Sequence, residues 1–139
     1  MRKKKKKYAN VMMLLLLLFV LFYIVMQDKT IKVAVNDLVK SYTTDIKPAD
    51  KKFLNKEVEI TGKVKLFLQT EGKKSLLELE TGSNELQLYC ILMNKVAEEK
   101  AAELTNGTTV VVIGRCLGVD PPSIKKFPNS IYIEAEQIR

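Results

Sequence analysis

Hydrophobic and polar residues fall in blocks along this chain, and one block near the N-terminus dominates the pattern. Residues 11–26 contain no charged residue, no proline and no glycine, and the uncharged stretch extends from residue 8 to residue 27. A helix of about 20 residues crosses the roughly 30 Å hydrocarbon core of a membrane. The run is apolar on every face, which a small soluble domain would use only for a buried core helix. We therefore predict a transmembrane helix over residues 8–27, with the core helix as the alternative.

The charges on either side of this run predict its orientation. Residues 2–7 are all positively charged, whereas Asp28 and Lys29 on the other side nearly cancel. The side richer in lysine and arginine stays in the cytoplasm, so residues 1–7 are expected to form a basic cytoplasmic tail and the later residues to lie outside. A cleaved signal peptide is the alternative. It is disfavoured because small residues are missing after the run and the nearest alanine is Ala34.

Residues 28–55 are predicted to be a helical linker. Four apolar residues recur at the spacing of one helical face within residues 30–44, namely Val35, Leu38, Val39 and Tyr42. Pro48 ends that helix, and residues 48–54 fit a second short helix that turns Phe53 and Leu54 toward the following domain. We expect this segment to be a stalk that also covers one end of the domain.

From residue 56 onward, apolar and polar residues alternate with the period of half-buried strands. The pattern predicts strands over residues 56–68, 75–81, 85–92, 109–117 and 131–138, and a helix over residues 94–104 capped by Asn94. Gly62 indicates a bend or bulge, and the valine-rich run from residue 109 indicates burial on both faces. The side chains expected to face inward are Val58, Ile60, Val64, Leu66, Leu77, Leu79, Leu86, Leu88, Leu92, Val110, Val112, Ile131, Ile133 and Ala135.

Three strands, a helix and two further strands make up the element order of the five-stranded OB barrel. We therefore predict a mainly β fold in which residues 56–139 form an OB-fold domain, with the helix between strands 3 and 4 closing the open end. An open α+β sheet of the same elements is the alternative, because periodicity alone does not decide closure.

Composition argues against catalysis. The chain has a net charge of +7, but residues 29–139 carry only +2, so the basic character belongs mainly to the N-terminal tail. The sequence contains no histidine, which is the commonest general base and zinc ligand, and no phosphate-binding glycine loop or nucleophile motif. We expect a protein that is not an enzyme and that uses no cofactor and no metal.

Short motifs spread over residues 35–139 resemble a known family. They comprise residues 49–53, the strand from Val58 to Val64, the strand centre from Leu88 to Cys90, and the segment from Asn106 to Gly118. Together they resemble the bacterial tRNA anticodon-like (tRNA_anti-like) family of envelope-associated proteins. The resemblance implies the OB fold and says little about activity, because members of the family are largely uncharacterised. Combined with the anchor, it implies a bacterial inner membrane protein with a periplasmic domain.

Basic and aromatic residues mark a candidate ligand site on the predicted barrel. In an OB fold the loops after strands 1 and 4 flank one face, so their side chains are expected to meet on one rim. The candidate residues are Lys73, Lys74, Lys125, Lys126 and Phe127 in these loops, with Tyr89 and Tyr132 pointing outward on neighbouring strands. The ordinary alternative is that the lysines keep the loops soluble and the tyrosines stabilise strand pairing.

These features predict a non-catalytic binding or interaction module, anchored in the membrane by one helix. Its partner would be an envelope protein, a glycan or another anionic ligand. Cations beside aromatic rings also suit single-stranded nucleic acid, which is the alternative. The low charge of the domain argues against a nucleic-acid partner. Cys90 and Cys116 both point inward and form either a disulfide or two separate buried thiols.

Overall fold

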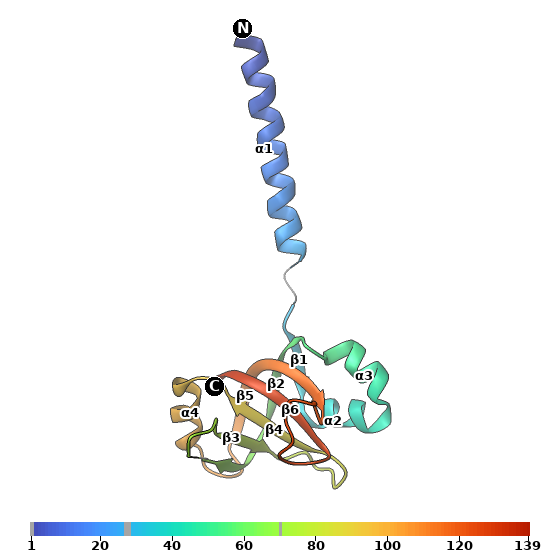
Figure 1. Ribbon diagram of the computed structural model, residues 1–139, viewed down its shortest axis with the longest axis vertical. Helices are drawn as coiled ribbons and strands as arrows, with labels where there is room; N and C mark the ends of the chain where they lie inside the picture. Colours follow the sequence, from blue (N-terminus) through green and yellow to red (C-terminus); the bar gives the residue numbers. More distant parts are fainter. Residues whose placement is uncertain (1, 27–28, 70) are drawn as a thin grey trace.

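The computed structural model describes residues 2–26, 29–69 and 71–139, with side chains described from residue 8 onward. It shows a long N-terminal helix followed by a β-barrel with helices on its surface (Figure 1). The predicted end of the span at residue 27, the start of the linker at residue 28 and position 70 of the first hairpin loop lie outside the described residues. The side chains of the basic tail lie outside them as well.

The elements follow one another in the predicted order, with one additional strand. The helices are α1 (Arg2–Val25), α2 (Val35–Thr44), α3 (Ile46–Phe53) and α4 (Lys95–Ala102). The strands are β1 (Ile31–Ala34), β2 (Glu57–Leu68), β3 (Leu76–Leu79), β4 (Gln87–Leu92), β5 (Thr109–Val119) and β6 (Ser130–Ile138).

Strand pairing closes the sheet into a barrel. The strands run in the order β2–β3–β4–β6–β5, and β5 pairs back with β2. The pairing of β4 with β6 is parallel, while the other four barrel pairings are antiparallel. The helix α4 connects β4 to β5, as the sequence predicts, and its N-cap Asn94 accepts a hydrogen bond from the backbone N–H of Ala97 at 2.9 Å. The prediction of a closed five-stranded OB barrel is confirmed.

The helix α1 stands apart from the barrel. Its apolar side chains from Val11 to Met26 are between 49% and 79% exposed. The segment Tyr8–Val25 has a mean hydropathy of 2.5 and none of it is buried by the rest of the protein. The core-helix alternative is therefore excluded, and α1 is a candidate membrane span by its length and composition.

Residues 31–53 differ from the predicted stalk. Ile31 to Ala34 form a strand, β1, which pairs in parallel with β2 from Ile31 opposite Val58. Apolar and polar residues alternate in this segment, a strand signal that lies directly before the helical spacing of α2. The helix α2 buries the four predicted residues, and α3 buries Phe53, all within the same core cluster as the barrel strands. These residues therefore pack on the barrel and do not hold it away from α1.

Most predicted inward positions lie in that core. The side chains of Val58, Ile60, Leu77, Leu79, Leu88, Val110, Val112 and Ile133 are at most 2% exposed. Leu66 was expected inside and is 41% exposed, because the β2–β3 register shifts between Val64 and Leu66 and Phe67 turns toward the core. The strand β5 is fully buried on one face only. Gly62 is expected from the sequence to mark a bend or bulge. In the structure the absence of a side chain at Gly62 makes room for the Val35 side chain on α2.

The two cysteines are free thiols on either side of one strand. Cys90 on β4 and Cys116 on β5 are both paired with Ile133 on β6, and neither is exposed. Two strand spacings place their Cα atoms roughly 9–10 Å apart, whereas a disulfide needs less than about 7 Å. The structure therefore favours the alternative of two separate buried thiols.

We expect both thiols to resist alkylation until the barrel unfolds. Burial raises the pKa of Cys90 and of Cys116 above the usual thiol range, so at pH 8 the reactive thiolate is almost absent. Mass-tagging with a maleimide should leave the folded protein unmodified and add two tags after denaturation without reductant. An unfolded, unreduced chain that takes up no tag would contradict the free-thiol state.

A candidate binding face on the outside of the barrel

A second apolar cluster covers the outer face of β3, β4 and β6. Its centre is formed by Leu76, Tyr89 and Tyr132, which are at most 4% exposed. Glu78, Tyr89 and Tyr132 stand side by side across these three strands. Partly buried side chains pack around the centre, namely Leu68, Ile91, Leu117, Ile124 and Phe127. We call these residues the outer-face cluster.

The loop between β5 and β6 covers part of this cluster and is fixed at two points. Asp120, at φ 44°, accepts hydrogen bonds from the backbone N–H groups of Asn129 at 3.1 Å and Ser130 at 3.0 Å, which closes the base of the loop. The Tyr132 hydroxyl donates to the carbonyl oxygen of Phe127 at 3.1 Å and accepts from its N–H at 3.0 Å. The loop therefore holds Phe127 in one place over the sheet.

Three aromatic rings stack on one another beneath and within this loop. The Tyr89 ring lies 4.7 Å from the Phe127 ring and 5.8 Å from the Tyr132 ring, with interplanar angles of 20° and 27°. Burial is the main cause that raises the pKa of Tyr89, and the negative charge of the nearby Glu78 raises it further. Burial also raises the pKa of Tyr132, so both hydroxyls stay neutral. The tyrosines have the outward phase predicted from the sequence, but the loop covers them. Of the three rings, Phe127 alone is partly exposed.

Two ion pairs lie on the outward side of the barrel strands. Lys65 binds Glu78 at 2.7 Å, and the Glu78 side chain is only 6% exposed. Arg115 Nε donates to Glu134 at 3.0 Å, and a second guanidinium nitrogen binds the same carboxylate. Each pair neutralises one carboxylate and one cation, although the Lys65 and Arg115 side chains stay more than half exposed. The apolar members of the outer-face cluster lie on the same strands, and the Lys126 ammonium lies 5.9 Å from the centre of the Phe127 ring.

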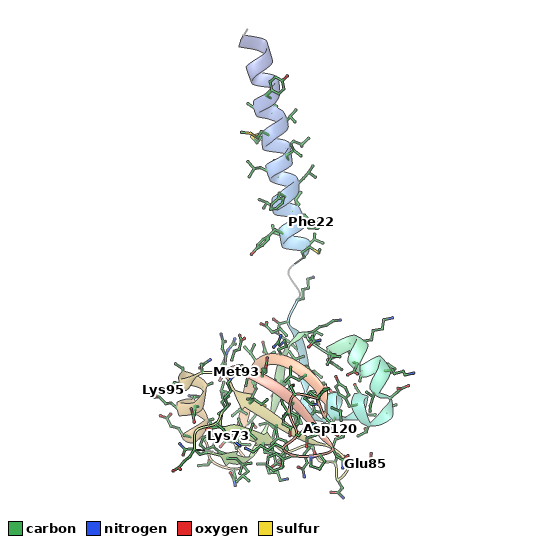
Figure 2. The ribbon with its side chains drawn as sticks, viewed as in Figure 1. Phe22, Lys73, Glu85, Met93, Lys95 and Asp120 are labelled. Carbon is green, nitrogen blue, oxygen red and sulfur yellow. The ribbon has the colours of Figure 1, made fainter. Side chains whose placement is uncertain are left out.

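The lysine pairs of the predicted site do not come together. The strand β3 begins with Leu76 opposite Ile91, near the C-terminal end of β4, so the preceding Lys73 and Lys74 lie at that end. The strand β6 begins beside Gln87, at the N-terminal end of β4, and the loop carrying Lys125 and Lys126 lies there. Figure 2 shows Lys73 and Asp120 on different sides of the barrel.

The first lysine pair instead borders a shallow pocket beside α4. Lys73 and Lys74 line it together with Met93, Lys95 and Glu98, and the Lys74 ammonium lies 3.3 Å from the Met93 sulfur. Three lysines and two glutamates line the pocket, so its net charge is only +1 and its attraction for an anion is weak. Within the described ranges, no group of three or more metal-ligating side chains is placed to hold an ion.

Sequence reasoning missed the apolar rim of the outer face. Leu76 and Ile91 are out of phase with the inward positions of their strands and therefore point outward. Both pack into the outer-face cluster and are not left in solvent. The available signal was the unbroken apolar run from residue 88 to residue 92, which is typical of a strand covered on both faces. Ile124 and Leu117 gave no comparable signal, because their burial depends on the path of the loop.

The family model for tRNA_anti-like proteins matches residues 2–127 of the chain. The chain belongs to the tRNA_anti-like family. This match begins at the first residue of α1 and therefore includes the apolar helix, which the sequence motifs left outside the resemblance. The OB barrel of this family is a binding domain. In a sequence comparison, no curated protein matches the chain.

Solved structures confirm the fold at low sequence identity. An asparaginyl-tRNA synthetase of Entamoeba histolytica in complex with asparaginyl-adenylate is 13% identical, with a TM-score of 0.52 over 81% of this chain and 24% of that one. A protein described as an aspartyl-tRNA synthetase of Leishmania major Friedlin is 18% identical, with a TM-score of 0.51 over 81% of this chain and 21% of that one. This tRNA_anti-like protein thus spans about a fifth to a quarter of the length of those enzymes.

Proposed function

We propose that this tRNA_anti-like protein is a non-catalytic binding module anchored in a bacterial inner membrane. In this proposal α1 is an uncleaved signal anchor, the basic tail lies in the cytoplasm, and the barrel lies in the periplasm. The outer-face cluster binds an apolar segment of an envelope protein. The observation that carries this proposal is an apolar cluster on the outside of the barrel, under a fixed loop and beside two ion pairs.

The anchor is supported by three independent features. The helix α1 exposes apolar side chains all around its circumference and makes no use of them in the barrel core. The family match includes it. The six positive charges that precede it favour a cytoplasmic N-terminus.

The same face argues for a protein ligand over the nucleic-acid alternative. Single-stranded nucleic acid needs aromatic ring faces on which bases stack, together with cations along the backbone path. Here Tyr89 and Tyr132 are covered, and their rings stack on neighbouring side chains. The lysine pairs lie at opposite ends of β4. Leu66 on β2 and Phe127 in the loop remain accessible, and exposed apolar groups of this kind are typical of protein contacts.

Site-specific photocrosslinking in cells tests this function. A photoreactive amino acid at position 127 should crosslink to a discrete protein, whereas the same amino acid at Val96, an apolar residue 76% exposed on α4, should not. The substitution Leu66→Asp should reduce that crosslink by about tenfold, as expected for an apolar contact residue. The matched substitution Val96→Asp should leave it unchanged.

Two outcomes would overturn the proposal. Equal crosslinking from positions 127 and 96 would show that the outer-face cluster has no special role. Steeply salt-dependent binding of a single-stranded oligonucleotide, weakened by substitution of Lys125 and Lys126, would favour the nucleic-acid alternative.

A further inference from the structure

The chain between α1 and the barrel is short. The helix α1 ends at Val25 and β1 begins at Ile31, and β1 is itself part of the sheet. Even fully extended, residues 26–30 reach no more than about 20 Å. A domain of this length measures roughly 30 Å across. If α1 spans the membrane, as the proposed function holds, the barrel has to stay at the membrane surface.

The strand pairing decides which side of the barrel is nearest to the membrane. Ile31 pairs with Val58 at the start of β2, and the Thr30 hydroxyl donates to the carboxylate of Glu57. Only residues 54–56 separate β2 from the end of α3. The chain therefore enters the barrel beside the C-terminal end of α3. Figure 1 shows β1 and α3 on the side facing α1, with β3 and β4 on the far side.

The surface of α3 beside this entry point is basic. Ala49 and Phe53 are buried against the barrel, whereas Pro48, Lys51 and Lys52 are exposed to solvent, and the Lys52 ammonium lies 4.9 Å from the centre of the Phe53 ring. The Lys56 ammonium donates to the carbonyl oxygen of Lys51 at 3.1 Å, which adds a further positive charge at the same end. Phosphate groups of anionic lipids attract basic clusters of this kind.

We propose that α3 lies on the anionic headgroups of the membrane that α1 spans, and that this contact gives the barrel one fixed orientation. Because β4 lies across the closed barrel from β2, the outer-face cluster then points away from the membrane toward a partner. Because α1 tethers the barrel to the membrane, α3 has a high local concentration near the lipid, and a few exposed lysines suffice for binding to the headgroups. The inference rests on the proposed anchor and adds an interaction surface and its partner.

Fluorescence quenching on the full-length protein in nanodiscs tests the contact. An introduced cysteine carries the fluorophore, because both native thiols are buried. One label is placed by Pro48→Cys on the exposed face of α3 and a second by Glu85→Cys on the far side of the barrel (Figure 2). The quencher is attached to the lipid headgroups, and the nanodiscs contain phosphatidylcholine with or without phosphatidylglycerol.

The expected result is strong quenching at position 48 that requires phosphatidylglycerol and is lost at high salt. The substitutions K51Q and K52Q together should reduce it by about twofold or more, whereas the matched pair K95Q and K100Q on α4 should not. Position 85 should remain unquenched in every case. The fixed orientation would be overturned by quenching at position 48 that depends neither on phosphatidylglycerol nor on Lys51 and Lys52. Equal quenching at positions 48 and 85 would overturn it as well.

The two proposals fail in distinguishable ways. A protein that does not co-purify with nanodiscs has no membrane anchor, and this result overturns the anchor and the lipid contact together. A protein that inserts normally but leaves position 48 unquenched retains its anchor and loses only the contact of α3. Thermal unfolding of each lysine variant confirms that the barrel is intact.

Discussion

Alanine at Gly114 is expected to destabilise the barrel by about 3 kcal/mol, at the upper end of the usual cost of overpacking. Gly114 lies at the register shift where β5 pairs with β6. A Cβ atom there would lie 2.9 Å from the Ala135 Cα and 2.7 Å from the Glu134 carbonyl carbon, and closer still to its oxygen. All three atoms are backbone atoms, so no rotamer change relieves the clash and the two strands have to separate.

Gly62 provides the matched comparison. A Cβ atom there would collide with a methyl group of Val35, which is a side-chain atom on α2. The substitution Gly62→Ala should therefore also destabilise the protein, and a second substitution, Val35→Ala, should relieve the clash by removing that methyl group. No truncation of a neighbouring side chain should rescue Gly114→Ala.

Urea unfolding of the detergent-solubilised full chain, followed by far-ultraviolet circular dichroism, measures both effects. If Gly114→Ala keeps the wild-type midpoint, the close approach of β5 and β6 is not required for folding. If Val35→Ala does not recover stability in the Gly62→Ala background, the clash with Val35 is not the cause of the destabilisation by Gly62→Ala.

The barrel is predictable from sequence because its strands obey a simple rule. Alternation marks Val58, Ile60, Leu77 and Leu79 as inward, and all of them are buried. That rule fails at Leu66, where a register shift changes which face a residue occupies without any change in composition. Periodicity gives the phase of a side chain but does not report a bulge one residue away.

The candidate site was less predictable than the fold. Tyr89 and Tyr132 have the predicted orientation, but their exposure depends on whether the loop from residue 120 to residue 129 folds over them. That path is set by the Tyr132 hydroxyl and by Asp120, through hydrogen bonds to backbone groups of the loop. Such bonds depend on tertiary geometry and leave no periodic trace in the sequence. The separation of the lysine pairs likewise follows from strand register.

The largest expected effect belongs to the anchor. Two arginines at Leu16 and Leu17, in the middle of α1, should each cost about 2.5–3.5 kcal/mol of insertion free energy, or roughly 6 kcal/mol together. The variant should leave the membrane fraction after carbonate extraction, whereas phenylalanines at the same two positions should keep the protein in it. Both side chains are more than half exposed in the structure, so the barrel itself should be unaffected.

The same preparation tests orientation and cleavage. Protease added to spheroplasts should degrade the wild-type barrel and spare the basic tail, and intact-mass analysis should find Met1 retained. A mature chain that begins after Met26 would show that α1 is a cleaved signal sequence. A double-arginine variant that stays in the carbonate-resistant pellet would show that the barrel, through its own lipid or protein contacts, holds the chain at the membrane without α1. That second result would show that the folded domain, and not the apolar run, supplies most of the free energy of membrane binding. The lysines of α3 would then be the first residues to substitute.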